Sequence, residues 1–356
     1  MGKLNKLVCH CSTPKDLKPP FITIMMPVRN EANYVSSSLK AVLSQDYPRE
    51  CTEVIVVDGM STDQTREIVK KYMLSHPNVQ LLDNTVKIAP TALNIALRKA
   101  RGDVIIRVDG HCEIAPDYVS RCVQHLFTEQ VDCVGGPIET IGENFSARTI
   151  AMAMSSFFGV GGSPFRTIKE KSLLVDSVAF PAYTREAVKK TGFFDEELVR
   201  NQDDEYNYRL RKLGGKILLS PDIRSRYYSR SSLIKLWQQY FQYGYWKVRV
   251  MQKHPYQMHP RQLVPPIFVA GLMTGSCIGL IYHPAWILSV IILAAYLMAN
   301  LAASAWLASR NGCRYLFLLP YVFMILHVSY GLGFLVGLVK FANGWRNWKF
   351  SGEIFQ

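Results

Sequence analysis

The distribution of charge along the chain is the feature that most restricts its fold. No acidic residue occurs from Ile223 to Gly352, and three long runs within that stretch carry no charge: Leu263–Tyr282, Pro284–Ser309 and Tyr315–Val339. Each run is long enough to cross a hydrocarbon core of about 30 Å. Lys and Arg residues stand only at the ends of these runs, as is typical of membrane-spanning helices. The last third of the chain therefore predicts an integral membrane protein.

The net charge of +13 comes from this same region. Residues 223–356 hold 13 Lys and Arg against one acidic residue, whereas residues 1–222 hold 28 against 27. A basic excess fits either nucleic acid or a membrane surface as the partner. Because the basic third is also the apolar third, membrane lipids are the expected partner and nucleic acid is not.

Composition shifts divide the chain into five parts. Residues 1–20 lack the apolar core of a signal peptide and are expected to form a tail. We expect an α/β domain over residues 21–229, an interfacial amphipathic helix over 230–262, about three transmembrane helices over 263–340, and a C-terminal tail over 341–356. The eight cysteines form no C-x-x-C pair, so no zinc site or disulfide framework is predicted and a reduced, cytoplasm-facing domain fits best.

Short β-branched runs alternate with helical patterns from Phe21 to Leu213. This alternation predicts an α/β fold with a mixed, mostly parallel sheet and helices on both faces. Strands are expected at 21–26, 53–57, 79–82, 104–108, 131–134 and 174–180, and helices at 32–44, 63–74, 90–100, 116–127 and 203–213.

Acidic residues follow three of the expected strands. The first strand leads into Pro27–Glu31, the second into Asp58-Gly59 and the fourth into Asp109–His111. In open α/β sheets ligands bind beyond the carboxyl ends of the strands, so these residues are expected at one ligand-binding edge. No G-x-G-x-x-G follows the first strand and no G-x-x-x-x-G-K-[ST] occurs, which disfavours a Rossmann dehydrogenase and a P-loop NTPase.

Four segments in this order resemble a known family: Phe21–Glu31, Val54–Asp63, Arg107–His111 and Asn201–Glu205. They resemble the family 2 glycosyltransferases with a GT-A fold, and most of all the membrane-anchored enzymes of exopolysaccharide assembly, of the succinoglycan type. The resemblance spans about residues 21–220. It implies a nucleotide-diphospho-sugar transferase fold followed by a helical membrane region.

The resemblance also implies a set of donor-site residues. The nucleotide contacts that it implies are Pro27, Arg29, Glu31, Asp58, Asn94 and Asp109, with Asp58 at the uracil. Asp109 matches the first acid of the family's D-x-D motif, and His111 stands where the second Asp usually is. We expect both to bind a divalent cation, Mn²⁺ or Mg²⁺, that bridges the diphosphate of the donor. If His111 is not a ligand, it hydrogen-bonds phosphate instead.

Asp203 matches the catalytic Asp of the family's E-D motif, with Gln202 in place of the Glu. A carboxylate within about 3 Å of an acceptor hydroxyl serves as general base. Asp204 and Glu205 compete for this role. One base and no covalent nucleophile imply a single displacement with inversion.

Apolar and aromatic residues recur every three or four positions between Ser231 and Met251, as in an interfacial helix. Processive members of the family carry a Gln-x-x-Arg-Trp motif on the corresponding helix. The segment Gln239–Tyr243 lacks the Arg, so we expect one sugar to be added per acceptor. Asp204, Gln239, Gln242 and Tyr243 are expected at the acceptor or membrane interface.

The leading hypothesis is an inverting, metal-dependent hexosyltransferase that uses a nucleotide sugar, by resemblance a UDP-sugar, and a lipid-linked saccharide acceptor. It is expected in the cell membrane with the catalytic domain facing the cytoplasm, together with other polysaccharide-assembly proteins. One alternative is a polyprenyl-phosphate glycosyltransferase, for which Arg224, Arg226 and Arg230 offer cationic groups. Another is a membrane scaffold that has lost catalysis, to which His111 and Gln202 are the only hints.

The number of membrane crossings is open at this stage. Three spans would place Lys340, Arg346 and Lys349 on the far side of the membrane, against the positive-inside tendency. Either that tendency fails here, or the first run, which contains Pro265 and Pro266, is re-entrant or interfacial.

Overall fold

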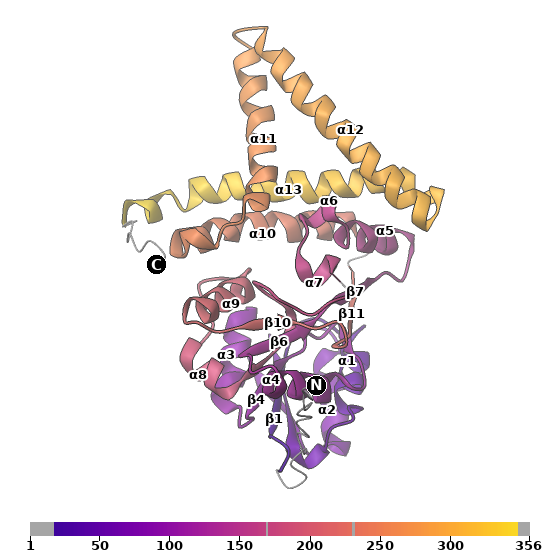
Figure 1. The fold of residues 1–356 in the computed structure, drawn as a ribbon, viewed down its shortest axis with the longest axis vertical. Coiled ribbons are helices and arrows are strands. Elements are labelled where there is room, and N and C mark those ends of the chain that lie inside the picture. The colour runs from indigo at the N-terminus through magenta and orange to yellow at the C-terminus, as the bar shows by residue number, and fades with distance from the viewer. Residues whose placement is uncertain (1–17, 169, 230–231, 348–356) are drawn as a thin grey trace, which may run out of the picture.

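The computed structural model describes residues 18–168, 170–229 and 232–347. Most of the N-terminal tail, Arg230 and residues 348–356 lie outside these ranges. The described chain has three parts, which Figure 1 shows from bottom to top: an α/β domain, a pair of helices lying across it, and two helices that rise away from that pair.

The α/β domain is built on an eight-stranded mixed sheet. In spatial order its strands are β3 (Val79–Asp83), β2 (Thr52–Asp58), β1 (Ile22–Val28), β4 (Val104–Arg107), β9 (Ala179–Thr184), β6 (Cys133–Gly136), β10 (Ile217–Leu219) and β8 (Leu173–Leu174). The first four are parallel to one another, whereas β9 is antiparallel to both of its neighbours. The prediction of a mixed, mostly parallel sheet is confirmed.

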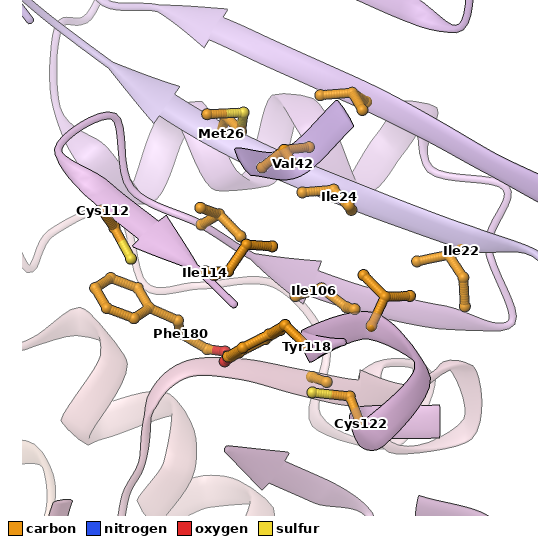
Figure 2. Close-up of a cluster of buried hydrophobic side chains, with 14 of the residues drawn as sticks. Ile22, Ile24, Met26, Val42, Ile106, Cys112, Ile114, Tyr118, Cys122 and Phe180 are labelled. Atoms are coloured by element: carbon orange, nitrogen blue, oxygen red, sulfur yellow. The ribbon is translucent and has the colours of Figure 1, made fainter. Parts of the chain in front are cut away.

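Helices cover both faces of this sheet. The helices on the sheet are α1 (Val35–Leu43), α2 (Thr65–Ser75), α3 (Ala89–Lys99), α4 (Tyr118–Thr128), α8 (Arg185–Thr191) and α9 (Gln202–Lys212). Three further helices, α5 (Phe145–Met154), α6 (Phe157–Val160) and α7 (Pro164–Thr167), lie away from the sheet toward the C-terminal helices (Figure 1). Side chains alternate between faces along a strand, so Ile24 packs with α1 and α4 while Met25 packs with α3 and α9. Figure 2 shows the first of these two cores, where Tyr118 lies against Phe180.

A second sheet of three short strands stands beside the edge where strands β1, β2 and β4 end. It pairs β5 (Cys112–Ile114), β11 (Ser225–Tyr228) and β7 (Ile138–Ile141), with β11 in the middle. Because β5 begins just after His111, this sheet continues the chain that leaves β4. None of its strands was predicted from the sequence.

Two predicted elements differ from the structure. The region expected to form one strand over 174–180 contains parts of two strands, β8 and β9. Strand β8 pairs with β10 at the edge of the sheet, whereas β9 lies between β4 and β6. The first strand does not end before Pro27 but continues to Val28. Pro27 is tolerated there because the pairing of β1 with β4 ends at Met25, so no ladder bond on that side needs its missing N–H.

The C-terminal region is helical. It comprises α10 (Leu233–Lys253), α11 (Pro260–Gly279), α12 (Ala285–Asn311) and α13 (Leu319–Lys340). By length and composition α11, α12 and α13 are each long and apolar enough to cross a membrane. Figure 1 shows α10 and α13 running side by side between the α/β domain and the two rising helices, α11 and α12.

Candidate active site

The edge where the parallel strands end is organised around Arg107, the last residue of β4. Its Nε and Nη2 atoms donate to the two carboxylate oxygens of Asp109, at 2.8 and 3.1 Å. Two parallel bonds of this kind fix a carboxylate in orientation as well as in position. The Arg107 side chain is only 11% exposed, so Asp109 is held from the protein side and its remaining lone pairs are left for a ligand.

The charges of this pair reinforce each other. Burial alone would raise the pKa of Asp109, but the guanidinium of Arg107, together with the nearby His111 and Arg200, outweighs burial and lowers that pKa. Burial likewise opposes the charge on Arg107, and the carboxylates of Asp109 and Asp203 outweigh it, so the pKa of Arg107 is raised. Both residues are therefore charged at neutral pH.

Asp203 approaches the same guanidinium from another element. It lies in the first turn of α9, and its Oδ2 is 3.9 Å from Nη1 of Arg107. The residue before the helix, Asn201, has a left-handed backbone with φ of 61° and turns the chain so that the helix begins at this edge. The Asp203 side chain is 48% exposed, which leaves it accessible to an incoming substrate.

His111 is oriented by a carboxylate. Its Nδ1 lies 2.9 Å from Oε1 of Glu31, a residue that follows β1, and its ring meets Tyr227 edge to face. With the Nδ1 proton donated to Glu31, Nε2 carries the free lone pair. Histidine ligands of metals characteristically donate their other ring N–H to a carboxylate in this way.

The two glycines that follow the strand-end aspartates are closely packed against the end of β1. A Cβ on Gly59 would lie 3.1 Å from the side chain of Arg29, and one on Gly110 would lie 2.9 Å from Val28 and 3.2 Å from Glu31. The end of β1 therefore passes directly over both glycines. This packing brings Arg29 and Glu31 onto the same edge as Asp109.

Asp58 lies at this edge but is fully buried. Its Oδ1 accepts from the Ser61 hydroxyl, and its Oδ2 accepts from the Ser61 backbone N–H and from Arg66, at 3.0 and 2.8 Å. Arg66 also pairs with Asp83 at the end of β3. In this arrangement Asp58 fixes the loop after β2, and any nucleotide contact has to use a lone pair of an oxygen that already has a protein partner.

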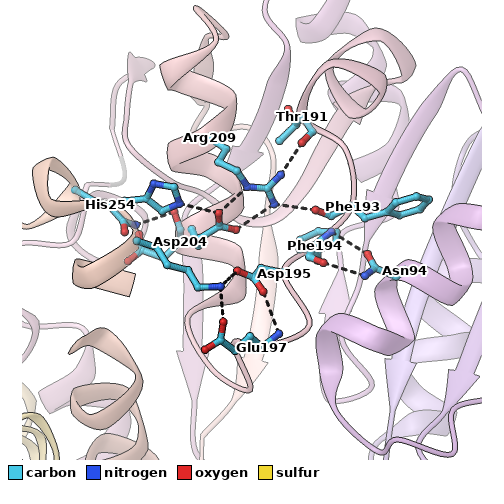
Figure 3. A network of polar contacts seen from close by, with 12 residues as sticks. Asn94, Thr191, Phe193, Phe194, Asp195, Glu197, Asp204, Arg209 and His254 are labelled. Carbon is cyan, nitrogen blue, oxygen red and sulfur yellow. Dashed lines mark hydrogen bonds and ion pairs between the residues drawn. The ribbon is translucent and has the colours of Figure 1, made fainter. Parts of the chain in front are cut away.

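The hydrogen bonds of the Asn94 side chain go to Phe194 and Glu196 and not to the other expected nucleotide contacts. The residue is 2% exposed, and its amide binds the backbone of Phe194 in both directions and the carboxylate of Glu196 (Figure 3). Because its donors and its acceptor are directed to this loop, the geometry gives Asn94 a structural role that the resemblance did not imply.

The expected acceptor residues lie where α9 meets α10. Asp204 binds Lys247 at 2.5 Å, and Gln242 accepts from Arg200 at 3.0 Å. The Tyr243 carbonyl accepts from Asn201, and its hydroxyl accepts from Gln239. Through these contacts the start of α9, which carries Asp203, packs directly against α10, the helix that was predicted to be interfacial.

Further ion pairs fasten α10 to the domain. Glu205 is 2% exposed and binds both Arg209 and His254, and Lys253 reaches Asp195 and Glu197 (Figure 3). Burial would raise the pKa of Glu205, but the hydrogen bonds from His254 and Arg209 lower it. The polar face of α10 is thus bound to α9 and to the loop before it.

The residues at the edge fit a divalent cation that is completed by its substrate. Among the described residues no three His, Cys, Asp or Glu side chains gather into a ready-made metal site. Mn²⁺ and Mg²⁺ in phosphate-transfer sites are commonly held by one or two protein side chains plus phosphate oxygens. Asp109 and an imidazole already oriented by Glu31 supply such a partial set.

A cavity of about 920 Å³ lies beside the three-stranded sheet, away from Arg107. Arg224 and Arg226 line it, and Arg226 is paired with Glu139. The two described arginines proposed for a phosphate acceptor therefore do not face Asp203.

Sequence reasoning placed Asp109, His111, Glu31 and Asp203 at one edge, and the structure brings them together. It missed Arg107, which links two of them. The available signal was a charged residue at the end of an otherwise apolar strand, two positions before an aspartate, because alternate residues on a strand point to the same side.

Comparisons with known proteins agree with this geometry. Residues 23–192 match the family model Glycosyl transferase family 2. The succinoglycan biosynthesis protein ExoA of Rhizobium meliloti (strain 1021) is 30% identical over 320 residues, covering 89% of this chain and 95% of that protein. A dolichyl N-acetyl-alpha-D-glucosaminyl phosphate 3-beta-D-2,3-diacetamido-2,3-dideoxy-beta-D-glucuronosyltransferase of Methanococcus voltae is 30% identical over 328 residues, covering 90% and 98%.

Solved structures share the fold. The mannosyltransferase PcManGT from Pyrobaculum calidifontis, in complex with GDP-Man and Mn²⁺, aligns with a TM-score of 0.58 at 20% identity, over 92% of this chain and 91% of that one. S. aureus TarS 1-349 in complex with UDP-GlcNAc aligns with a TM-score of 0.52 at 17% identity, over 88% and 90%. The chain therefore belongs to the family 2 glycosyltransferases and has their GT-A fold.

Proposed function

We propose that this glycosyltransferase moves a hexose from a UDP-sugar to a lipid-linked saccharide at the membrane, with inversion at the anomeric carbon. The observation that carries the proposal is the shared guanidinium: Arg107 binds Asp109 and lies 3.9 Å from Asp203. A carboxylate suited to the donor diphosphate and one suited to the acceptor hydroxyl thus stand side by side.

The donor side comprises the ends of β1 and β4. In the proposal Pro27, Arg29 and Glu31 border the nucleotide, while Asp109 and Nε2 of His111 hold Mn²⁺ or Mg²⁺. When bound, the cation supplies positive charge that neutralises the departing diphosphate. Glu31 contributes by orienting His111 through the 2.9 Å contact with Nδ1. Asp58 and Asn94 support the neighbouring loops.

Asp203 is proposed as the general base. Its carboxylate takes the proton of the acceptor hydroxyl while the acceptor oxygen bonds to the anomeric carbon. The bond from that carbon to the diphosphate oxygen breaks, and the nucleoside diphosphate leaves with the electron pair. One displacement inverts the centre, so an α-linked donor gives a β-linked product.

The acceptor side is proposed to face α10. Asp204 and Gln242 join α9 to α10 through Lys247 and Arg200, which brings the base next to a helix suited to the membrane interface. A lipid-linked saccharide presents its hydroxyl at that level. The names of the two curated relatives, one for succinoglycan biosynthesis and one for a dolichyl phosphate-linked sugar, support an acceptor of this class.

The proposal places the protein in the cell membrane with the α/β domain facing the cytoplasm, where it adds one sugar per acceptor alongside other polysaccharide-assembly proteins. A polyprenyl-phosphate acceptor is less well supported, because Arg224 and Arg226 line a separate cavity. The paired carboxylates of a catalytic edge also weigh against an inactive scaffold.

The test is transfer by the full-length protein in nanodiscs, with radiolabelled UDP-hexoses, UDP-N-acetylhexosamines and GDP-mannose as donors and lipid extract as acceptor. We expect label from a UDP-sugar in the lipid fraction, and its loss in EDTA. Label from GDP-mannose alone would contradict the donor proposal, and full transfer in EDTA would contradict the metal. Transfer to polyprenyl phosphate alone would contradict the saccharide acceptor.

A further inference from the structure

The first half of α13 rests on the α/β domain. Just before this helix Tyr315 stacks on Phe145 of α5, with ring centroids 5.0 Å apart. Phe323 packs edge to face on Phe158 of α6 at 5.0 Å, and Nε2 of His327 lies 2.9 Å from the Phe158 carbonyl oxygen. Because α5 leads directly out of the three-stranded sheet, this end of α13 lies on the domain side.

The middle of α13 contacts α10 backbone to backbone. A Cβ on Gly244 of α10 would lie 2.0 Å from the Tyr330 carbonyl oxygen, and one on Gly333 of α13 would lie 2.0 Å from the Phe241 carbonyl oxygen. Gly337, four residues after Gly333, is also against α10. Small residues at four-residue spacing allow this close approach, so α13 follows α10 along its length.

The far end of α13 also lies on the domain side. Gln252 of α10 donates to the Phe341 carbonyl at 2.7 Å and accepts from Arg249. Arg249 in turn binds Glu197 of the α/β domain at 2.5 Å. The two ends of α13 are therefore tied to the same body, one through α5 and α6 and the other through α10.

This arrangement is incompatible with a crossing. A helix of 22 residues is about 33 Å long, close to the roughly 30 Å of a hydrocarbon core. A spanning helix of that length has its ends on opposite sides of the bilayer. Both ends of α13 contact elements attached to a water-soluble domain, so the helix axis has to lie along the membrane surface.

The side of α13 that faces away from α10 is apolar. Its exposed apolar residues are Leu316 and Phe317 just before the helix and Tyr321, Met324, Val336 and Val339 within it, and the exposed Lys340 is the last residue of the helix. They recur at helical intervals opposite the buried stripe. In Figure 1 the α11–α12 pair rises from this same side, and α11 and α12 also carry many exposed apolar side chains. One continuous apolar surface thus faces away from the domain.

The charges agree with two crossings. No Asp, Glu, Lys or Arg occurs between Arg261 and Arg310, and α11 runs through its two internal prolines as one helix. A hairpin of α11 and α12 puts residues 280–284 on the far side. Arg314 and Lys340 then remain on the side of the domain, as the positive-inside tendency requires.

We infer that α11 and α12 cross the bilayer as a hairpin, whereas α13 lies in the plane of the membrane between α10 and the acyl chains. The occupant of the exposed face of α13 is the lipid of the leaflet next to the catalytic domain. With this topology the chain obeys the positive-inside tendency, and the first apolar run, which forms α11, crosses the membrane. The inference does not depend on which sugar or acceptor is used.

The test is cysteine accessibility in sealed membrane vesicles of known orientation. The background is the full chain with Cys9, Cys11 and Cys277 replaced by Ser, which keeps the exposed Cys313 between α12 and α13 as a marker for the domain side. Asn343→Cys reports the end of α13 and His283→Cys reports the hairpin tip. Labelling uses a membrane-impermeant maleimide that shifts the protein on a gel.

In vesicles with the α/β domain outside, we expect the maleimide to label both Cys313 and the Asn343→Cys site. The His283→Cys site should be labelled, and shift the protein on the gel, only in vesicles of the opposite orientation. Reaction of Asn343→Cys together with His283→Cys would show that α13 crosses. A His283→Cys site that reacts from the domain side, or from neither side, would overturn the hairpin.

A depth measurement gives an independent test. Spin labels at Tyr321→Cys, Val328→Cys and Val339→Cys, in a background that also replaces Cys313 by Ser, lie along one face of α13. An in-plane helix predicts equal accessibility to oxygen and to a water-soluble nickel complex at all three. A crossing helix would instead bury the middle label deeply and leave the last one exposed to water.

Discussion

Nη1 of Arg107 lies 3.9 Å from Oδ2 of Asp203, while Nε and Nη2 of the same guanidinium hold both oxygens of Asp109. One buried cation thus sets the relative position of two carboxylates, one just after β4 and one in α9. Loss of Asp109 removes the two hydrogen bonds to Arg107, whereas loss of Asp203 removes only a neighbouring charge. The proposed roles of the two residues, cation binding and general base, can therefore be tested separately.

Asp203→Asn is expected to lower kcat by about 10²–10⁴-fold with little change in the affinity for UDP. The loss is that of a general base, and the amide keeps the size of the side chain. The measurement is steady-state transfer in nanodiscs combined with UDP binding by calorimetry.

Asp204→Asn is the matched control, one residue further along α9. This change leaves Lys247, which is 3% exposed, without its carboxylate, so we expect lower thermal stability and a smaller loss of kcat. If Asp204→Asn abolished transfer while Asp203→Asn left it intact, the base assignment would pass to Asp204.

Arg107→Gln is expected to move the acid limb of the kcat/KM profile to higher pH. In the native protein the guanidinium lowers the pKa of Asp109 against the effect of burial, so its removal leaves burial to raise that pKa. The stabilising contribution of the native pair is present above the ordinary Asp value near 4 and is lost as pH falls through the lowered pKa. At neutral pH the variant should lose about 3–5 kcal/mol, as for a broken buried pair.

Arg107→Lys provides the control because it keeps the charge but not the two parallel bonds. Its acid limb should move less than that of Arg107→Gln, while its kcat still falls because Asp203 loses its neighbour. An acid limb that stays in place in Arg107→Gln would show that Asp109 does not govern this part of the profile. Both profiles are measured by initial rates, together with thermal unfolding.

The sequence was sufficient to predict this edge in part. Strands β1, β2 and β4 are β-branched runs, and the acid that follows each one is visible without a structure. The strands of the three-stranded sheet were missed because runs of three or four residues are too short to show a period. The packing of Asn94 against the loop at Phe194 depends on a contact across 100 residues, which no local pattern encodes.

The membrane region shows a different limit of sequence reasoning. Composition reports that a helix is apolar enough for lipid, and α11, α12 and α13 pass this criterion equally. The direction of a helix depends on its neighbours, and the decisive signal for α13 is the close approach of Gly333 and Gly244 to a partner backbone. Those glycines are visible in the sequence, but their partners are not.

Glu31→Ala is expected to weaken Mn²⁺ binding about 10–100-fold, the usual cost of losing a carboxylate that orients a histidine ligand. Glu31 holds Nδ1 of His111 at 2.9 Å, and without it the imidazole loses the hydrogen bond that orients Nε2. Binding is measured by the Mn²⁺ EPR signal in the presence of UDP, so the result does not depend on turnover.

Glu31→Gln is the conservative control, since its amide oxygen still accepts a hydrogen bond from Nδ1 and should retain most of the affinity. His111→Asp restores the common D-x-D pattern and is expected to bind Mn²⁺ with little dependence on residue 31. Unchanged Mn²⁺ binding in His111→Ala would remove His111 from the ligand set and leave Asp109 as the protein ligand.

Glu197→Gln is expected to loosen α10 from the α/β domain at low salt. Hydrogen bonding to Arg249, aided by Lys253, lowers the pKa of Glu197 to about 2, so its stabilising contribution is present above the ordinary Glu value near 4.3 and is lost as pH falls through about 2. The side chain is 47% exposed, so solvent screening limits the effect to roughly 1 kcal/mol or less. Thermal unfolding of the nanodisc-bound protein should show a difference from wild type at about 50 mM salt that shrinks at about 500 mM.

Glu139→Gln, which breaks the exposed pair with Arg226, is the matched control for transfer activity. An equal loss of transfer activity in both variants would show that the attachment of α10 has no special part in catalysis.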